Sequence, residues 1–368
     1  MTANLPRISV LPLAKLTKGS YTYILYDLLQ REFEINVIGL PSKLTISELL
    51  AAIGTKSIFH IHWIEHKYTL GMVNRLGRFS KFFVLFTLPL FLLCLFMLRS
   101  VGCTIVTTLH NMVPHRVLFP RLERCAFKIT LHMSKIVYVH TTHAKLKAIS
   151  LYGLSDRKIK KIYHGNWMHV NSNVYTTMKA RQLLSIDADA FVMCFIGRLS
   201  PDKGLHLLLE CLLNVKLNVP LYLIVAGSPS DKEYFDRLIR KYGSLSLPVT
   251  IMWYPYRISN SCLNLLVNAC DVGVLPYVKT STPSTILLFM SFGKPVIAPS
   301  FPEVKEFVGC SNWLLYDNLI DLSAIIEKAA DSKTALSKVG EDLLKRVKMF
   351  DWKQTAQKTY ESFLELQT

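Results

Sequence analysis

The chain has 368 residues, of which 51% are hydrophobic and 19% charged, so it is long enough for two domains and too apolar to be disordered. Lys and Arg outnumber Asp and Glu by 43 to 26, and the resulting charge of +17 favours partners that carry phosphate. The sequence has neither zinc-finger spacing nor an aromatic RNA-binding signature, so nucleic acid is not the expected partner. Eight cysteines without a C-x-x-C pair indicate a reducing compartment.

The first half of the chain alternates short apolar runs with helix-like stretches, which predicts a parallel sheet with helices on both faces. We take 1–170 as the N-terminal domain. Its predicted strands are Arg7–Leu11, Glu34–Gly39, Ser57–His62, Cys103–His110, Lys135–His140 and Lys158–Tyr163. Its predicted helices include Ser20–Arg31, Ile46–Ile53, Arg121–Met133 and His143–Tyr152.

One segment, Phe82–Leu98 (82–98), has seventeen residues without a charge, at the lower edge of the about 17–25 that span a membrane. Basic residues flank it, at Arg75, Arg78, Lys81 and Arg99. Because the strands on either side should belong to one sheet, a single crossing would separate them. We therefore expect a monotopic dip into an anionic membrane surface, which Pro89 could bend. A buried core helix and a true span are the alternatives.

The second half repeats the alternating pattern after a polar linker at Gly165–Asp189 with a short helix near Tyr175–Leu184. We take 171–350 as a second domain and 351–368 as a helix crossing back to the first. The predicted strands are Phe191–Ile196, Leu221–Ala226, Val249–Trp253, Asp271–Leu275, Pro295–Ala298 and Trp313–Tyr316. The predicted helices are Leu205–Val215, Lys232–Tyr242, Ser259–Ala269, Ser284–Phe292, Leu319–Ala330, Lys333–Met349 and Trp352–Leu366. The expected fold class is α/β, with two doubly wound Rossmann-like domains facing a cleft.

The strongest chemical signal directly follows the strand Phe191–Ile196, in the run Gly197-Arg-Leu-Ser-Pro-Asp-Lys-Gly204. Ligands of parallel sheets bind beyond the carboxyl ends of the strands. There Gly197 would let a ligand approach the backbone, and the planar guanidinium of Arg198 can hold phosphate oxygens. Lys203 adds a second positive charge near the next helix. We interpret this run as a diphosphate site rather than an ordinary charged turn.

This run resembles the GT-B glycosyltransferases, specifically those similar to family 4. The segments Ala269–Tyr277, Leu287–Pro299 and Phe350–Trp352 extend the resemblance, which is most specific between Gly197 and Pro299. In such enzymes the Arg and Lys neutralise the departing donor diphosphate. The resemblance thus implies that Arg198 and Lys203 are catalytic, and it implies a retaining reaction.

The chain departs from the family pattern in the donor-sugar loop. Many relatives carry an E-x7-E pair, and the corresponding positions here hold Thr280 and Leu288. A subgroup similar to bacterial polysaccharide transferases has a Ser-Gly-Ser-like turn instead, to which Ser284 and Thr285 correspond. These two residues are predicted to cap a helix and contact the donor, although a plain cap is equally compatible with the sequence. Glu306 is predicted to bind a donor hydroxyl.

In the N-terminal half, histidines and one tryptophan follow the predicted strands. His110 matches a strand-end histidine that touches the donor sugar in similar family members, so we predict a catalytic-site role. His62 and Trp63 are predicted to line the acceptor side, where flat rings suit sugars. Gly19 would let the acceptor or a phosphate approach. The histidines lack ordinary metal spacing, so no metal is expected.

Together these observations predict a hexosyltransferase that uses a UDP- or GDP-linked sugar without a cofactor. The acceptor would be a glycan or polyprenyl-diphosphate-linked oligosaccharide, in cell-surface polysaccharide synthesis at the cytoplasmic face of the membrane. Two alternatives stay open at this point. One is a nucleotide-sugar epimerase of GT-B-like fold, and the other is a membrane-attached sugar-nucleotide-binding protein without catalysis. The sequence does not indicate the oligomeric state.

Overall fold

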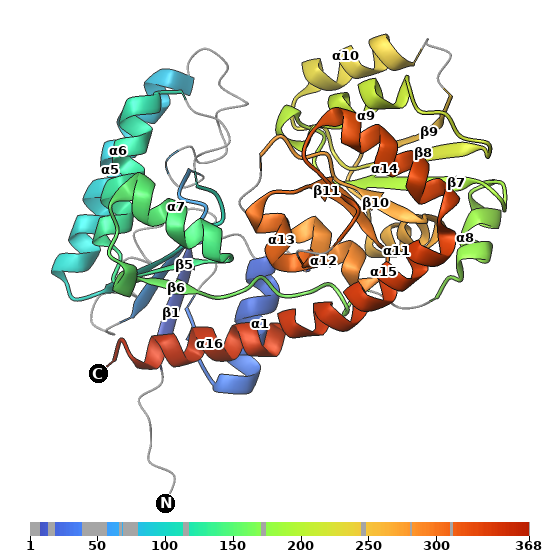
Figure 1. Ribbon diagram of the computed structural model, residues 1–368. Coiled ribbons are helices and arrows are strands. Elements are labelled where there is room, and N and C mark those ends of the chain that lie inside the picture. The colour runs from blue at the N-terminus through green and yellow to red at the C-terminus, as the bar shows by residue number, and fades with distance from the viewer. Residues whose placement is uncertain are drawn as a thin grey trace, which may run out of the picture. The chain divides into compact units, whose positions relative to one another are not determined.

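The computed structural model describes residues 8–13, 19–38, 57–65, 68, 80–112, 118–170, 174–243, 248–279, 282–309 and 312–367 (Figure 1). The chain divides into two compact units. One consists of Met1–Gly165 with Asp351–Thr368, and the other of Asn166–Phe350. The boundary thus lies a few residues before the one predicted after residue 170.

The N-terminal unit is built on six parallel strands in the order β2-β1-β3-β4-β5-β6. The centre of the sheet is buried, because β3 has five buried residues and β5 four. Such strands need helices on both faces. The strands are β1 (Ser9–Leu13), β2 (Asn36–Val37), β3 (Ile58–His62), β4 (Thr104–Thr108), β5 (Ile136–Val139) and β6 (Ile159–Lys161).

Two apolar clusters cover the two faces of this sheet. One face packs against α1 (Tyr21–Phe33) and the C-terminal helix α16 (Trp352–Leu364), which lie side by side. Phe33 stacks on Tyr360 at 4.8 Å between ring centroids. The other face packs against α5 (Ser80–Ser100), α6 (Pro120–Met133) and α7 (Thr142–Tyr152). The predicted helix at Ile46–Ile53 lies outside the described residues.

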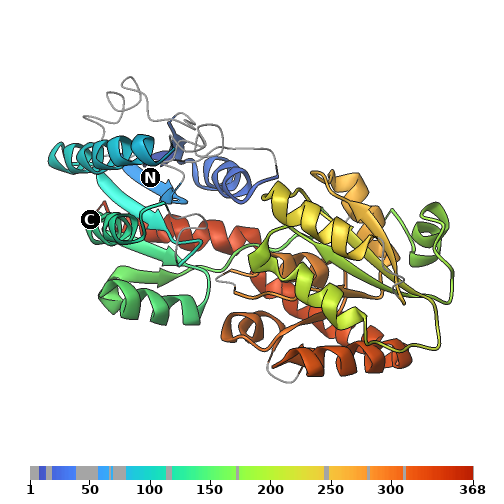
Figure 2. The ribbon, with the colours of Figure 1, turned by 90° about the horizontal axis from the view of Figure 1, so that it is seen from above.

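The apolar segment forms α5, an unbroken helix of 21 residues that contains Pro89 (Figure 2). Pro89 therefore does not break the helix. The helix connects β3 to β4, which pair in parallel over five residues, as expected for strands of one sheet. By length and composition α5 could cross a membrane, but its contacts with α6 and β4 make it the crossover helix of this sheet.

Only one side of α5 is buried. Val84, Leu88, Leu95 and Leu98 belong to the core of the unit. The opposite side exposes large apolar side chains, with Phe82 73%, Phe86 78% and Phe96 65% accessible. The alternative of a buried core helix therefore describes only one side of α5, because the other side forms an exposed apolar face.

The C-terminal unit holds a second parallel sheet of six strands, in the order β12-β11-β10-β7-β8-β9. The strands are β7 (Phe191–Ile196), β8 (Leu221–Ala226), β9 (Thr250–Tyr254), β10 (Val272–Val274), β11 (Val296–Pro299) and β12 (Leu315–Tyr316). The helices are α8 (Thr177–Leu183), α9 (Leu205–Leu212), α10 (Lys232–Tyr242), α11 (Asn260–Ala269), α12 (Ser284–Ser291), α13 (Pro302–Val308), α14 (Leu319–Asp331) and α15 (Lys333–Val347). Both halves thus have the predicted alternation.

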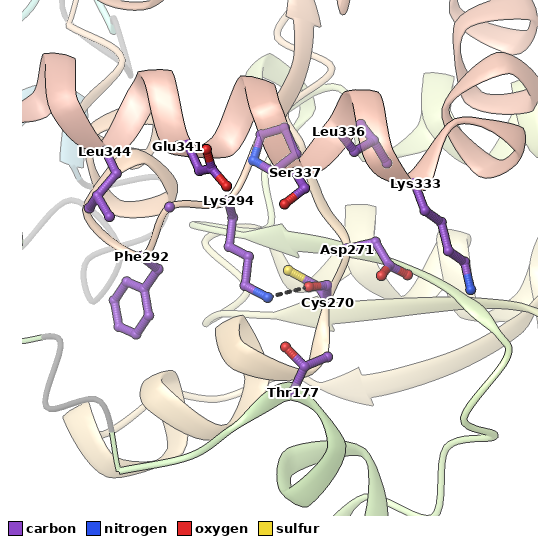
Figure 3. A pocket seen from close by; sticks show the side chains of 12 residues that line it. Thr177, Cys270, Asp271, Phe292, Lys294, Lys333, Leu336, Ser337, Glu341 and Leu344 are labelled. Atoms are coloured by element: carbon purple, nitrogen blue, oxygen red, sulfur yellow. Dashed lines mark hydrogen bonds between the residues drawn. The ribbon is translucent and has the colours of Figure 1, made fainter.

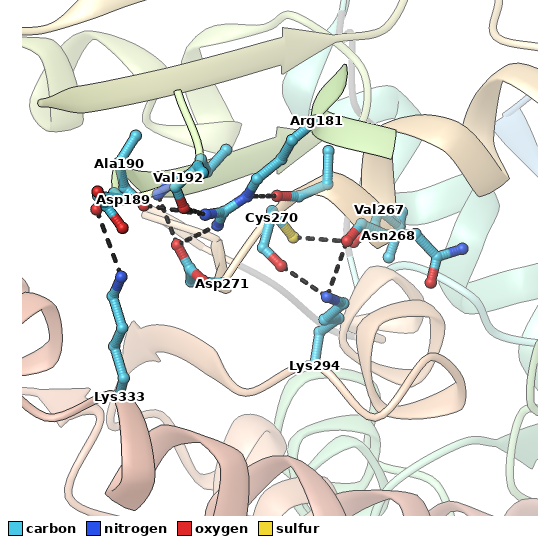
Figure 4. Close-up of polar contacts among 12 residues, drawn as sticks. Arg181, Asp189, Ala190, Val192, Val267, Asn268, Cys270, Asp271, Lys294 and Lys333 are labelled. Atoms are coloured by element: carbon cyan, nitrogen blue, oxygen red, sulfur yellow. Dashed lines mark hydrogen bonds and ion pairs between the residues drawn. The ribbon is translucent and has the colours of Figure 1, made fainter. Parts of the chain in front are cut away.

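A buried arginine attaches the short linker helix α8 to this sheet (Figure 4). The Arg181 guanidinium donates to the carbonyl oxygens of Ala269 at 3.0 Å and Ala188 at 2.7 Å. It also pairs with Asp271 at 2.7 Å, and the same carboxylate oxygen accepts the Val192 N–H at 2.8 Å. This bonding compensates the burial of the charge, so the segment predicted as a linker is an integral part of the unit.

Candidate functional site

The first group of predicted site residues lies at the carboxyl ends of the strands in the C-terminal unit. Gly197 follows β7 with φ 148°, and Gly227 follows the neighbouring β8 with φ 143°. A Cβ atom on Gly227 would lie 1.8 Å from the Gly197 carbonyl oxygen. The two turns can approach each other this closely only because glycine occupies position 227.

The loop after β7 also packs directly on the loop after β10. Gly204 has φ 73°, and a Cβ atom there would lie 1.7 Å from the carbonyl oxygen of Pro276. The Val278 N–H donates to the Asp202 carbonyl at 3.1 Å, which joins the same two loops. Backbone contacts of this kind place Lys203, the residue before Gly204, at the carboxyl edge of the sheet.

The two predicted phosphate ligands are close enough to influence each other. Arg198 is exposed, and no carboxylate pairs with its guanidinium among the residues that the structure describes. Lys203 is half-buried, with its Nζ 4.8 Å from the centroid of the Tyr277 ring and 3.9 Å from Asp202. Burial lowers the pKa of Lys203, Asp202 opposes this effect, and the charge of Arg198 lowers it further. Two neighbouring cations with one carboxylate beside them are suited to an anionic ligand.

Ser284 and Thr285 lie in the first turn of α12, but neither caps it. The N-cap is Pro283 and there is no side-chain cap hydrogen bond, so the predicted capping role is wrong. The Ser284 N–H donates instead to the Thr282 carbonyl at 2.8 Å. The side chain of Thr285 instead hydrogen-bonds the phenol of Tyr277. Burial raises the pKa of that phenol, and the Thr285 contact partly offsets this. Tyr277 thus connects Thr285 to Lys203.

The acidic residues beyond β11 occupy successive turns of α13. Glu303 is only 2% exposed, whereas Glu306, the predicted donor ligand, is half-buried. Its carbonyl oxygen accepts a hydrogen bond from Arg346 at 3.1 Å. Thr280, at the first position of the missing E-x7-E pair, lies outside the described residues, and Leu288 is buried inside α12.

The second group of predicted residues lies at the carboxyl edge of the sheet in the N-terminal unit. Gly19 precedes α1 with φ 79°, and no atom of the described residues lies within 4 Å of where a Cβ atom would be. Trp63 follows β3 and stacks on His110, with ring centroids 4.3 Å apart and planes 12° apart. Trp63 has φ 49°, which is strained for a side chain of this size. The pair forms a flat aromatic platform, which we call the Trp63–His110 platform.

A row of hydrogen-bonded side chains lies beneath this platform. His62 Nδ1 lies 3.1 Å from His110 Nε2, and His110 Nδ1 lies 3.1 Å from His140 Nε2. Tyr26 joins His62, at 2.9 Å, to His60, at 2.8 Å. His62 is completely buried, so it supports the platform and does not line an acceptor surface as predicted.

Burial sets the protonation state of the row. It lowers the pKa of His60 to about 3 and that of His140 to about 4. It also lowers the pKa of His110 well below its usual value, and the neighbouring histidines add to this effect. The ring nitrogens bond to each other and to Tyr26, and the described residues contain no group of three metal-ligating side chains.

One hollow of the C-terminal unit lies at the opposite, amino-terminal edge of its sheet (Figure 3). It has a volume of about 350 Å³, and its lining includes Lys294, Lys333 and Glu341. The Lys294 ammonium donates to the carbonyl oxygens of Asn268, at 3.1 Å, and Cys270, at 2.7 Å. Because this charge already has internal partners, the hollow is less suited to a phosphate than the carboxyl edge.

Several contributors to the two sites were not singled out from the sequence. Tyr277 lies in the segment Ala269–Tyr277 but carries no signal of its own there. Gly227 directly follows a strand, where a glycine is a recognisable signal. Tyr26 carries no sequence signal at all, because it sits in an ordinary helix. Ser200 Oγ is buried in the loop that carries Arg198 and has no hydrogen-bond partner among the described residues.

Comparison with known proteins identifies the class. Residues 177–342 match the family described as Glycosyl transferases group 1. GDP-mannose:glycolipid 4-beta-D-mannosyltransferase of Xanthomonas campestris pv. campestris is 24% identical over 321 residues, which cover 86% of this chain and 81% of that protein. A D-inositol 3-phosphate glycosyltransferase of Mycobacterium tuberculosis is 26% identical over 165 residues, 44% of this chain and 33% of that protein.

Solved structures show the same fold. HepE from Anabaena, in complex with UDP and glucose, superposes with a TM-score of 0.68 at 18% identity, over 98% of this chain and 100% of that chain. Sucrose-phosphate synthase from Thermosynechococcus elongatus gives a TM-score of 0.68 at 16% identity, over 98% and 99%. The fold is therefore GT-B, as predicted.

The chain is a glycosyltransferase, in the hexosyltransferase class. More particularly, residues 177–342 of its C-terminal unit are similar to the glycosyl transferases group 1 family. The epimerase and the inactive binding protein are not favoured by these matches.

Proposed function

We propose that this enzyme transfers a hexose from a nucleotide-diphosphate sugar to a membrane glycolipid. One observation carries the proposal: Arg198 and Lys203, both positively charged, lie near each other at the carboxyl edge of the second sheet. Lys203 is held over the ring of Tyr277. The half-buried Lys203, together with the exposed Arg198 beside it, can stabilise the negative charge that develops on a departing diphosphate. No cofactor or metal enters this proposal.

The relatives support particular substrates. The mannosyltransferase of similar length is named for GDP-mannose and a glycolipid, and HepE was crystallised with UDP and with UDP-glucose. We therefore propose a GDP- or UDP-linked donor, with GDP-mannose as the first to test. Ser284, Thr285, Glu306 and Gly197 are the proposed additional donor contacts, and Gly19 and Trp63 the proposed acceptor contacts.

The stereochemical outcome is best decided by the product. The family resemblance implied retention, whereas the relative's name specifies a β linkage. A donor with an α-linked sugar would have to be inverted to give a β product. The anomeric configuration of the transferred sugar, read by NMR, distinguishes the two outcomes.

We further propose that the enzyme works on the cytoplasmic face of a membrane, on polyprenyl-diphosphate-linked or related acceptors for cell-surface polysaccharide. The exposed aromatic side chains of α5 support this, since a contiguous apolar face on a basic protein is suited to an anionic bilayer. The seven described cysteines are all unpaired, in keeping with a reducing compartment.

The donor is tested by incubating the protein with GDP-mannose, UDP-glucose and related donors, with membrane glycolipids as acceptor. Nucleoside diphosphate release that depends on the acceptor, and is lost in Arg198→Ala, supports the proposal. Arg237→Ala, on the exposed surface of α10, is the matched control. An intact nucleotide carrying an altered sugar, or no turnover with any donor, would contradict it.

The membrane is tested by flotation with liposomes containing anionic phospholipid. Replacing Phe82, Phe86 and Phe96 by Ser should abolish co-flotation while leaving the buried side of α5 intact. The control replaces Met178 and Ile320, which are 79% and 81% exposed in the other unit. Co-flotation that survives the triple replacement would show that α5 is not the membrane contact.

A further inference from the structure

The histidine row of the N-terminal unit begins at a backbone carbonyl. His140 Nδ1 lies 2.9 Å from the carbonyl oxygen of Ile162, which can only accept a hydrogen bond. The proton of the neutral His140 ring must therefore be on Nδ1. Its Nε2 then carries a free electron pair and has to act as an acceptor.

This assignment determines every following bond. His110 Nδ1 must donate to His140 Nε2 at 3.1 Å, which leaves His110 Nε2 to accept from His62 Nδ1, also at 3.1 Å. His62 Nε2 then accepts from the Tyr26 hydroxyl at 2.9 Å.

Beyond Tyr26 the same polarity continues. The Tyr26 oxygen accepts from His60 Nδ1 at 2.8 Å, and His60 Nε2 accepts from the Thr108 hydroxyl at 2.8 Å. All six hydrogen bonds thus run in one direction, toward the Ile162 carbonyl. Reversing any single one would place two donors or two acceptors face to face inside a buried cluster, which is costly.

The polarity of the row bears on the platform above it. Because both nitrogens of His110 are bonded, its ring plane is constrained, and Trp63 stacks on that plane at 12°. Tyr21 adds an edge contact to the His110 ring at 4.9 Å. The orientation of the platform therefore depends on residues that lie below it and cannot reach a substrate.

We propose that His140 is a positioning residue of this enzyme: it transmits the polarity of the Ile162 carbonyl to His110, and so holds the Trp63–His110 platform in one tautomer and one plane. The proposal rests on the proposed function only in assuming that the platform contacts a sugar. The polarity of the row itself is independent of that assumption.

The polarity is tested first without any substitution. In protein labelled with ¹⁵N-histidine, two-bond correlation spectra distinguish protonated from unprotonated ring nitrogens. We expect His110, His62 and His140 all to be protonated on Nδ1 and unprotonated on Nε2. The resonances are assigned from variants in which one histidine at a time is replaced. Protonation of His110 on Nε2 instead would overturn the proposal.

Three substitutions separate the two contacts of His140. Phe removes both contacts, and Asn keeps a group near Nδ1 but is too short to reach His110. Gln places an amide oxygen near the former Nε2 position, where it can accept from His110. We expect His140→Gln to retain the His110 tautomer, and His140→Asn and His140→Phe to yield a mixture. Equal spectra in all three variants would contradict the proposal. If a variant fails to fold, the tautomers measured in the wild-type protein still test the proposal.

Turnover provides the second readout. We expect kcat to fall about tenfold in His140→Asn, by analogy with the loss of about 10–100-fold when a partner that orients a metal-binding histidine is removed. We expect substantial recovery in His140→Gln. His132→Gln is the matched control, because His132 also bonds a backbone carbonyl, that of Tyr152 at 2.9 Å, outside the row. If His140→Asn gave a mixture of His110 tautomers but an unchanged kcat, His140 would have no positioning role in catalysis. Absence of transfer by the wild type would instead contradict the proposed function and leave the row intact.

Discussion

The ammonium group of Lys203 lies 4.8 Å from the centroid of the Tyr277 ring. Lys203 comes from the loop after β7 and Tyr277 from the loop after β10, and the Tyr277 phenol is in turn bonded by Thr285 at the start of α12. The position of one cation thus depends on three segments of the chain. A buried aromatic ring below and Asp202 to the side restrict the lysine without neutralising it by a close ion pair.

Removal of this cation should affect catalysis more than folding. We expect Lys203→Ala to lower kcat by about 100-fold, because the loss of one preorganised group that stabilises developing charge is of this order. Tyr277→Phe keeps the ring and should retain most activity. The measurement is kcat with the donor that the donor assay selects, and the melting temperature is recorded for each variant. Equal activity of wild type and Lys203→Ala would exclude a role for this residue in departure of the diphosphate.

The close packing of the two loops predicts a strong effect at Gly204. Gly204→Ala introduces a Cβ atom 1.7 Å from the Pro276 carbonyl oxygen at φ 73°. We expect a loss of more than about 2 kcal/mol in the free energy of unfolding, since the left-handed backbone alone costs about 1–2 kcal/mol. Gly153→Ala is the control: φ is 65°, but no atom in the described part of the chain lies within 4 Å of the new atom. Similar losses at both positions in urea denaturation would show that the loop contact is unimportant.

The buried ion pair that attaches α8 should be expensive to break. Asp271→Ala leaves the Arg181 guanidinium, whose side chain is 7% exposed, without its carboxylate. We expect a loss of about 3–5 kcal/mol in the free energy of unfolding. Glu233→Ala breaks the exposed pair with Arg237 and should cost less than about 1 kcal/mol. Chemical denaturation of the two variants under identical conditions measures the difference, and equal losses would contradict the structural role of Arg181.

The histidine row predicts how stability depends on pH. Burial holds the pKa of His140 at about 4 and that of His60 at about 3, below the usual 6.5. Between pH 6.5 and about 4 the unfolded chain therefore binds protons that the folded chain does not. The stabilisation is fully present above pH 6.5 and is lost as the pH falls, by up to about 1.4 kcal/mol per pH unit for each histidine.

Urea denaturation at pH 7 and at pH 5 checks this expectation. His60→Gln removes one of the titrating groups and should reduce the slope, whereas the exposed His132→Gln should leave it unchanged. A free energy of unfolding that is the same at both pH values would mean that the row titrates normally.

Much of this fold could be predicted from the sequence, because its signals are local. The period of the apolar residues located strands such as Phe191–Ile196 and helices such as Lys232–Tyr242, both of which have the predicted bounds. The motif Gly197–Gly204 was also readable, since ligands of parallel sheets bind where strands end. The roles of Arg198 and Lys203 in catalysis stay predictions that the variants above test.

The sequence by itself determined the alternation of elements, the two-sheet architecture and the chemistry available at the strand ends, because these follow from residue order and hydrophobic period. Only the tertiary structure decided which distant side chains meet. It placed Tyr277 under Lys203, left one side of α5 exposed, and bonded Tyr26 to His60 and His62 in a buried row. Such contacts depend on side-chain packing across strands far apart in the chain, for which no local pattern exists.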